Sequence, residues 1–212
     1  QSESFINEQF NQDPNQTDYW FLKRSMLHSH LKVNQRFELF LELNSSLINS
    51  KQNISPVDRD ALSLNQLFVQ FNISDLWHLT VGRQNLRLGS GRLVDIREGP
   101  NVRLSFDIVH IEYQKDRNSV QVFYAIPLKQ KAGVFDNEAL YWQESLSAVY
   151  WARNWTKHHQ TDIYALYKEE GSKSWNAGVA NDARLSLGIR HYGDFKQVHF
   201  NNEFVYQLGT FG

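Results

Sequence analysis

The residues best suited to chemistry are five arginines clustered in the segment 81–107, "VGRQNLRLGSGRLVDIREGPNVRLSFD". They are Arg83, Arg87, Arg92, Arg97 and Arg103. A guanidinium group keeps its charge at every physiological pH, and its forked donors match the two oxygens of a carboxylate. The partner is therefore a carboxylate on a neighbouring strand or on a passing solute. Gly82, Gly89 and Gly91 in the same segment allow a bulge or a bend where a strand enters a long loop.

The composition limits the function classes open to this chain. Lys plus Arg number 22 against 23 Asp plus Glu, so no overall basic field indicates a nucleic acid partner. Cysteine is absent, which excludes a disulfide scaffold and thiolate metal sites. No run approaches the roughly 18 apolar residues of a membrane-spanning helix. The mean hydropathy of -0.54 remains compatible with a membrane β-barrel, because only alternate residues of its strands face lipid.

The first residues differ in character from the rest of the chain. The segment "QSESFINEQFNQDPNQ" has neither a basic region nor an apolar core of a signal peptide. We therefore expect a mature chain from which a signal peptide has been removed. Residues 1–18 are expected to be an N-terminal extension, and residues 19–212 to be the strands of an incomplete transmembrane β-barrel.

Hydrophobic residues recur with a period of two along most of the chain. In "FELFLELN" (37–44), the apolar Phe37, Leu39, Leu41 and Leu43 share one face of a strand. The same alternation predicts about ten strands, and no segment has a competing helical period. The predicted fold class is all-β, an antiparallel meander.

The predicted connections alternate in length. Short links are expected near 34–36, 74–76, 115–118, 154–159 and 192–195, and long ones near 49–60, 86–102, 129–139 and 169–182. Short turns at one rim and long loops at the other are typical of an outer-membrane barrel. Aromatic residues at strand ends also favour the membrane over a small soluble barrel, since they suit the interfacial girdles. They are Trp20, Trp77, Tyr113, Trp142, Trp151 and Trp155.

The arginine segment resembles the alginate-export type of outer-membrane porin. The matching positions are Gly82, Arg83, Gln84, Gly89, Arg92, Leu93, Val94, Asn101, Arg103, Phe106 and Asp107. The segments "LFVQF" and "EFVYQLGTFG" are similar as well. This resemblance implies a barrel of about eighteen antiparallel strands, of which this chain would supply the N-terminal part. It also implies a passive pore in the outer membrane of a Gram-negative bacterium that conducts anionic saccharides or other small solutes, with no cofactor and no catalysis.

The candidate site residues follow from the matched motif and from strand alternation. Arg83, Arg92 and Arg103 are expected to contact solute because they belong to the motif. A second set, expected to face the lumen from alternation alone, is Arg24, Lys32, Arg184 and Arg190. Their expected ion-pair partners in the lumen are Asp107, Glu38, Glu42 and Glu203. An alternative is that the arginines pair with Asp95, Glu98 and Asp107 and only stiffen a loop inside the barrel.

Other motifs favour binding or structural roles over catalysis. His28 and His30 face the same way on one strand, and without a third ligand nearby we expect them to be polar lining. No nucleophile and base can be assembled from spacing. The expected partners are outer-membrane lipid, an anionic saccharide or small solute, and possible envelope proteins. Two rival functions remain open: a barrel that serves as a partner-binding scaffold of a secretion or uptake complex, and a soluble carbohydrate-binding β protein.

Overall fold

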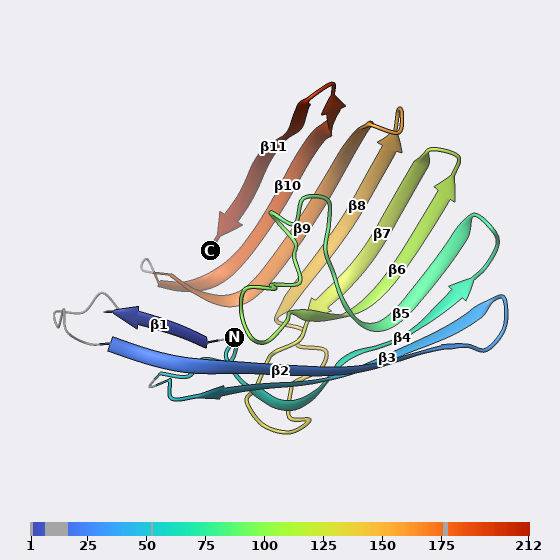
Figure 1. Cartoon of the computed structure of the whole chain (residues 1–212). Helices are drawn as coiled ribbons and strands as arrows, with labels where there is room; N and C mark the ends of the chain where they lie inside the picture. Colours follow the sequence, from blue (N-terminus) through green and yellow to red (C-terminus); the bar gives the residue numbers. More distant parts are fainter. Residues whose placement is uncertain (1, 7–16, 52, 176–177) are drawn as a thin grey trace.

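Eleven strands make up the computed structural model, which describes residues 2–6, 17–51, 53–175 and 178–212. They are β1 (Ser2–Ile6), β2 (Thr17–Lys32), β3 (Phe37–Asn49), β4 (Asp60–Asn72), β5 (Trp77–Asn85), β6 (Ser105–Lys115), β7 (Asn118–Pro127), β8 (Glu144–Asn154), β9 (His159–Trp175), β10 (Gly178–Phe195) and β11 (Val198–Phe211). Each strand pairs antiparallel with the next, in one curved sheet of order β1 to β11 (Figure 1). The predicted all-β meander is confirmed. In the described ranges, no helix has the length and apolar character that crossing a membrane requires.

The strand links fall into two groups, largely as predicted. Tight turns at 33–36, 73–76, 116–117, 155–158 and 196–197 lie at one rim, and the long links 50–59, 86–104 and 128–143 lie at the other. Two predicted links are wrong. Residues 192–195 belong to β10, and most of 169–182 is strand, since β9 continues to Trp175. Backbone pairing continues there without apolar alternation, so hydropathy did not reveal it.

The segment 1–18, predicted to be an extension, contains a strand. Ser2–Ile6 forms β1 and pairs with the beginning of β2, from Thr17 to Phe21. Residues 7–16, which join the two strands, lie outside the described residues.

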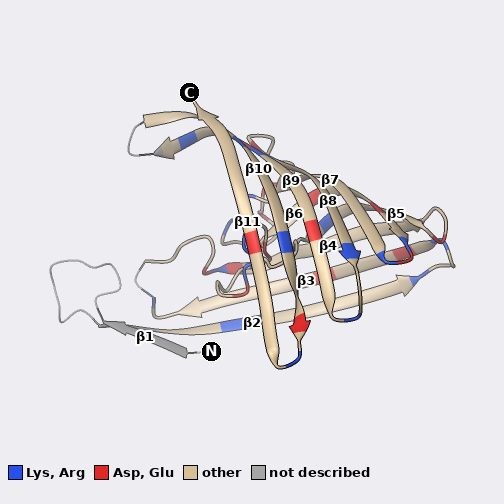
Figure 2. Ribbon diagram, turned by 90° about the horizontal axis from the view of Figure 1, so that it is seen from above, with Lys and Arg blue, Asp and Glu red and all other residues tan. Residues whose placement is uncertain are grey.

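The outer face of the sheet carries a broad belt of exposed apolar side chains. The belt includes Leu27, Leu31, Leu67, Phe71, Val81, Val109, Ile111, Val122, Tyr124, Val149, Ile163, Leu187, Ile189, Phe204, Tyr206 and Leu208. Cross-strand registers such as Val69 with Val81 and Val81 with Val109 hold these positions on one side. Figure 2 shows long uncharged stretches of strand with isolated charged positions between them. So large an exposed apolar surface is unfavourable in water and favourable against lipid.

The inner, concave face carries apolar as well as charged side chains. On β6 to β9 it carries a hydrophobic core that includes Phe106, Phe123, Tyr150, Tyr164 and Leu166. Three buried members of this core belong to no strand: Leu86, Leu88 and Val94 lie in the link between β5 and β6. Residues 86–104, here called the inner loop, therefore fold into the concavity and cover part of the wall (Figure 1).

Where the chain leaves β5 to form the inner loop, the link 128–143 takes the place of β5 beside β4. β5 ends at Asn85, which leaves the first residues of β4 without β5 as a neighbour. Residues of the link 128–143 take this place: the Ala61 and Leu62 amides donate to the carbonyls of Ala132 and Gly133, and the Phe135 amide donates to the Leu62 carbonyl. The backbone groups at this sheet edge are thus satisfied, as burial or lipid contact requires.

Candidate functional site

The first half of the inner loop is docked against β8, β9 and β11. Glu203 of β11, whose side chain is only 5% exposed, accepts hydrogen bonds from Ser90 Oγ at 2.6 Å and Tyr164 Oη at 2.7 Å. Arg92 Nη1 lies 3.2 Å from the same carboxylate. Three donors from two segments therefore converge on one carboxylate, which fixes the loop to the wall.

Gly89 permits this docking. Its φ is +52°, a left-handed conformation that favours glycine, and a Cβ at this position would overlap the Tyr150 hydroxyl. Tyr150 cannot easily yield, because its hydroxyl donates to Asp162 at 2.7 Å and its ring stacks on Tyr164.

Gly89→Ala is therefore expected to loosen the inner loop. The left-handed φ and the overlap together should cost about 1 to 3 kcal/mol of loop docking. Limited trypsin digestion measures this, since cleavage after Arg87 and Arg92 should become severalfold faster, roughly in line with that free energy. Gly99→Ala in the same loop is the matched control, because a Cβ there meets nothing within 4 Å. Equal cleavage rates in the two variants would contradict the docking role of Gly89.

The second half of the inner loop is tied to the opposite wall. Asn101 Nδ2 donates to the carbonyls of Leu47 and Asp58, both at 3.0 Å, and Ser46 Oγ donates to the Asn101 carbonyl at 2.8 Å. The Val102 amide also donates to the Val57 carbonyl. The inner loop thus spans the concave face from β11 to β3 and the loop that follows it.

Asp58 holds this anchoring loop in shape. Lys51 Nζ lies 3.1 Å from the Asp58 carboxylate, which also accepts from the Ser55 amide and hydroxyl at 2.8 Å each. Burial acts to raise the pKa of Asp58, but the bonds from Ser55 and Lys51 outweigh it, and the pKa lies below its ordinary value. The carboxylate therefore stays ionised at neutral pH.

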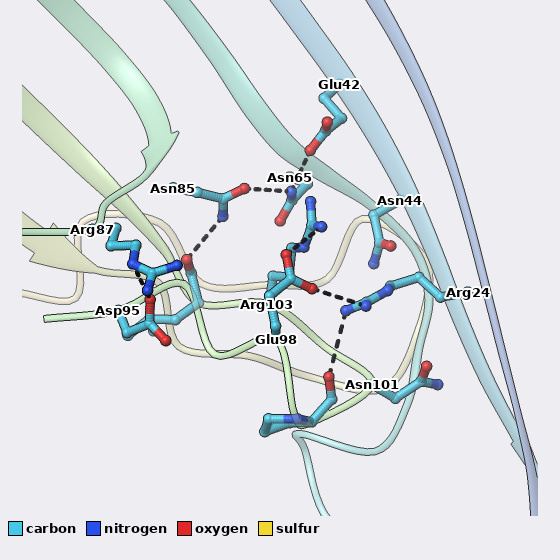
Figure 3. Close-up of polar contacts among 12 residues, drawn as sticks. Arg24, Glu42, Asn44, Asn65, Asn85, Arg87, Asp95, Glu98, Asn101 and Arg103 are labelled. Atoms are coloured by element: carbon cyan, nitrogen blue, oxygen red, sulfur yellow. Dashed lines mark hydrogen bonds and ion pairs between the residues drawn. The ribbon is translucent and has the colours of Figure 1, made fainter. Parts of the chain in front are cut away.

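Most of the predicted arginines are engaged with acids of the same chain. Glu98 binds both Arg103 and Arg24 of β2, the latter at 3.0 Å (Figure 3). Within the loop, Arg87 Nε lies 3.4 Å from Asp95. These pairs favour the bracing alternative for Arg24 and Arg103, and they show that the loop is internally stiffened.

Arg83 and Asp107 do not face the lumen. They pair bidentately at 2.8 and 3.2 Å, but their register with Leu67 and with each other places both on the outer face. The expectation that both line the lumen is wrong. The physical reason is the strand period, since Arg83 shares the parity of Val81 rather than that of Gly82.

The remaining predicted residues lie on the inner face, each with partners. Lys32 pairs with Glu38 at 3.3 Å, Arg184 with Asp182 at 2.8 Å, and Arg190 with Asp162 at 3.2 Å.

Glu42 and the histidines of β2 complete this picture. Glu42, expected to pair with a cation, accepts hydrogen bonds from the side-chain amides of Asn65 and Gln66; Figure 3 shows the contact with Asn65. His28 and His30 lie against Phe40. Among the described residues, no group of three or more His, Cys, Asp or Glu is arranged to hold a metal ion.

A cavity of about 510 Å³ lies between the inner loop, the link 128–143 and the loop-side ends of β8 and β9. Its charged lining consists of Arg92, Arg97, Lys129, Lys168, Asp95 and Glu144. The lining thus has four cations and two anions, and we call this cavity the basic pocket. Two of the cations pair with acids outside the lining, Lys129 with Glu138 at 3.7 Å and Lys168 with Glu170 at 2.7 Å. Arg97 is exposed and has no ion pair within the described part of the chain.

Sequence reasoning did not select Arg97, Lys129 or Lys168 as site residues. The two lysines lie on segments far from the motif, and only the folding of the inner loop brings them beside it. The presence of Arg97 in the arginine-rich segment was the one available signal.

A curved antiparallel sheet with a lipid-compatible outer belt and a loop folded inside it defines a β-barrel transport protein of the outer membrane. The family model of alginate export matches residues 1–212, and the chain belongs to this family. This is a transport family and not a family of enzymes, and the soluble alternative is incompatible with it. No curated protein matches the chain.

Proposed function

We propose that this chain lines a selective, passive pathway for an anionic saccharide of the polyuronate type across the outer membrane. The inner loop forms the constriction of the pathway, and the basic pocket is where solute carboxylates bind. Arg92 and Arg97 present guanidinium groups to the solute, and Lys129 and Lys168 add charge from the opposite side.

The charge balance of the basic pocket carries this proposal. A polyanion needs repeated weak sites that attract it and still release it. Most arginines on the inner face are neutralised by an acid at short range, as in the pair of Arg190 with Asp162. In the basic pocket, Arg92, Lys129 and Lys168 each pair with an acid, but Arg97 has no ion pair within the described residues. The pocket therefore offers an anionic group positive charge that is not neutralised.

Single-channel recording in planar bilayers tests the proposal. The purified protein should give steady, anion-favouring conductance that a mannuronate hexamer blocks reversibly. A neutral β-1,4-mannan hexamer at the same concentration serves as the matched solute and should block less. An inserted protein that conducts nothing, or that favours cations, would refute the proposal and leave the partner-binding scaffold as the better account.

A further inference from the structure

Three aromatic rings form a continuous band across the inner face of β2, β3 and β4. His28 stacks on Phe40 with ring centroids 6.1 Å apart and planes 15° apart, and Phe40 stacks on Phe68 at 5.1 Å and 19°. His30, also on β2, lies 6.2 Å from Phe40 in a tilted orientation. We call His28, Phe40 and Phe68 the aromatic band.

The band lies on the face of the sheet where apolar rings are least expected. Phe40 and Phe68 are only half-buried and His28 is exposed, on the same side as Glu42. The same strands β3 and β4 carry a second pair, Phe37 and Phe71, in edge contact at 5.2 Å on the outer face. Lipid favours that outer pair, whereas water disfavours the exposed part of the band.

The polar groups around the band are suited to hydroxyls. Glu42 is held by the amides of Asn65 and Gln66, and Gln70 Nε2 donates to Asn72 Oδ1 at 3.1 Å. The amides donate and accept and the carboxylate accepts, as recognition of sugar hydroxyls requires.

The residue paired with Phe68 on the neighbouring strand β5 has no side chain. This residue is Gly82, which presents no side chain over the ring. A ring with no side chain on its β5 partner, beside hydroxyl-binding groups, is suited to a flat, partly apolar ring.

We propose that the aromatic band binds the C–H face of a pyranose ring, as a contact separate from the basic pocket. A pyranose ring combines an apolar face with a rim of hydroxyls, which fits rings flanked by amides. The band would thus recognise the neutral part of the saccharide and the basic pocket its carboxylates. This inference rests on the proposed function for the statement that a saccharide reaches the inner face.

Equilibrium binding to the purified protein in detergent tests the band without requiring conduction. Saturation-transfer NMR and calorimetry with the β-1,4-mannan hexamer should show binding through the ring C–H protons. The double variant Phe40→Leu with Phe68→Leu keeps apolar volume but removes the rings, so its affinity should fall about tenfold. Phe37→Leu with Phe71→Leu is the matched control on the same two strands and should bind as the unaltered protein does.

Each outcome of these binding experiments supports or overturns the aromatic band as a saccharide contact. Loss of affinity confined to the inner-face double variant supports the band, and Phe68→Tyr should then retain binding because it keeps a ring. Equal affinities in both double variants, equal losses in both, or no binding of the hexamer to the unaltered protein would overturn it. A protein that binds the hexamer through the band but is silent in bilayers would refute the proposed function alone.

Discussion

Glu203→Ala is expected to convert a steady conductance into a larger and noisier one. The change removes the acceptor shared by Ser90, Arg92 and Tyr164, and so releases the inner loop from β11. Loss of a nearly buried, charge-assisted acceptor should cost about 1.5 to 3 kcal/mol, enough to raise the undocked fraction of the loop by roughly ten- to a hundredfold. Single-channel recording would show the noise, and hydrogen exchange would show faster exchange over residues 86–95.

Two further variants make this result interpretable. Glu203→Gln keeps an acceptor for Ser90 and Tyr164 but loses the charge that attracts Arg92, so its effect should be intermediate. Glu112→Ala is the matched control, because Glu112 is also an inner-face carboxylate but binds only Gln114 and Ser119 near the turn rim. If the conductance of Glu112→Ala is as noisy as that of Glu203→Ala, the inner loop is not the element that sets the conductance.

The second large effect is expected from Arg97→Glu. This change moves the charge of the basic pocket by two units at a position that has no ion pair in the described part of the chain. At an exposed site the interaction is screened, so we expect the affinity for the mannuronate hexamer to fall about tenfold, or about 1.4 kcal/mol. The preference for anions over cations should fall with it, which reversal potentials in a salt gradient measure.

The control for this charge reversal is Arg36→Glu. Arg36 is exposed in the turn between β2 and β3, at the rim opposite the basic pocket. Arg36→Glu changes the net charge of the chain by the same amount as Arg97→Glu but leaves the basic pocket intact. A tenfold loss of block in both variants would mean that the overall field, and not the pocket, attracts the solute.

The strands were predictable because a sheet with lipid on one side imposes strict alternation. The segment 37–44 alternates at every position except Phe40, and it forms the beginning of β3. Arg83 was wrongly expected on the inner face because the alternation was followed only as far as Gly82. Had the alternation of Trp77, Leu79 and Val81 been extended by one step, Arg83 would have been placed on the outer face.

The course of the inner loop was harder to predict, because its contacts join residues far apart in sequence. Ser90 and Glu203 are 113 residues apart, and no local pattern pairs them. One signal was present and not used: β6 and β7 are apolar on both faces, with Phe106, Ile108 and Phe123 on the side expected to be polar. An inner wall that is apolar must be covered, and the leucines at 86 and 88 are what cover it.

The segment that pairs with β4 changes along the strand, from residues 132–135 at its beginning to β5 at its end. This change bears on the order in which the contacts form during folding. The lower-numbered part of β4 finds its edge partner only when residues 132–135 arrive, after β5, the inner loop, β6 and β7 have all been synthesised. A contact of this sequence separation forms late, because loop closure must precede it. The contact of Ser90 with Glu203, which docks the inner loop, spans 113 residues and so is expected to form later still. The wall beside the inner loop is therefore expected to be paired before the loop is fixed to β11.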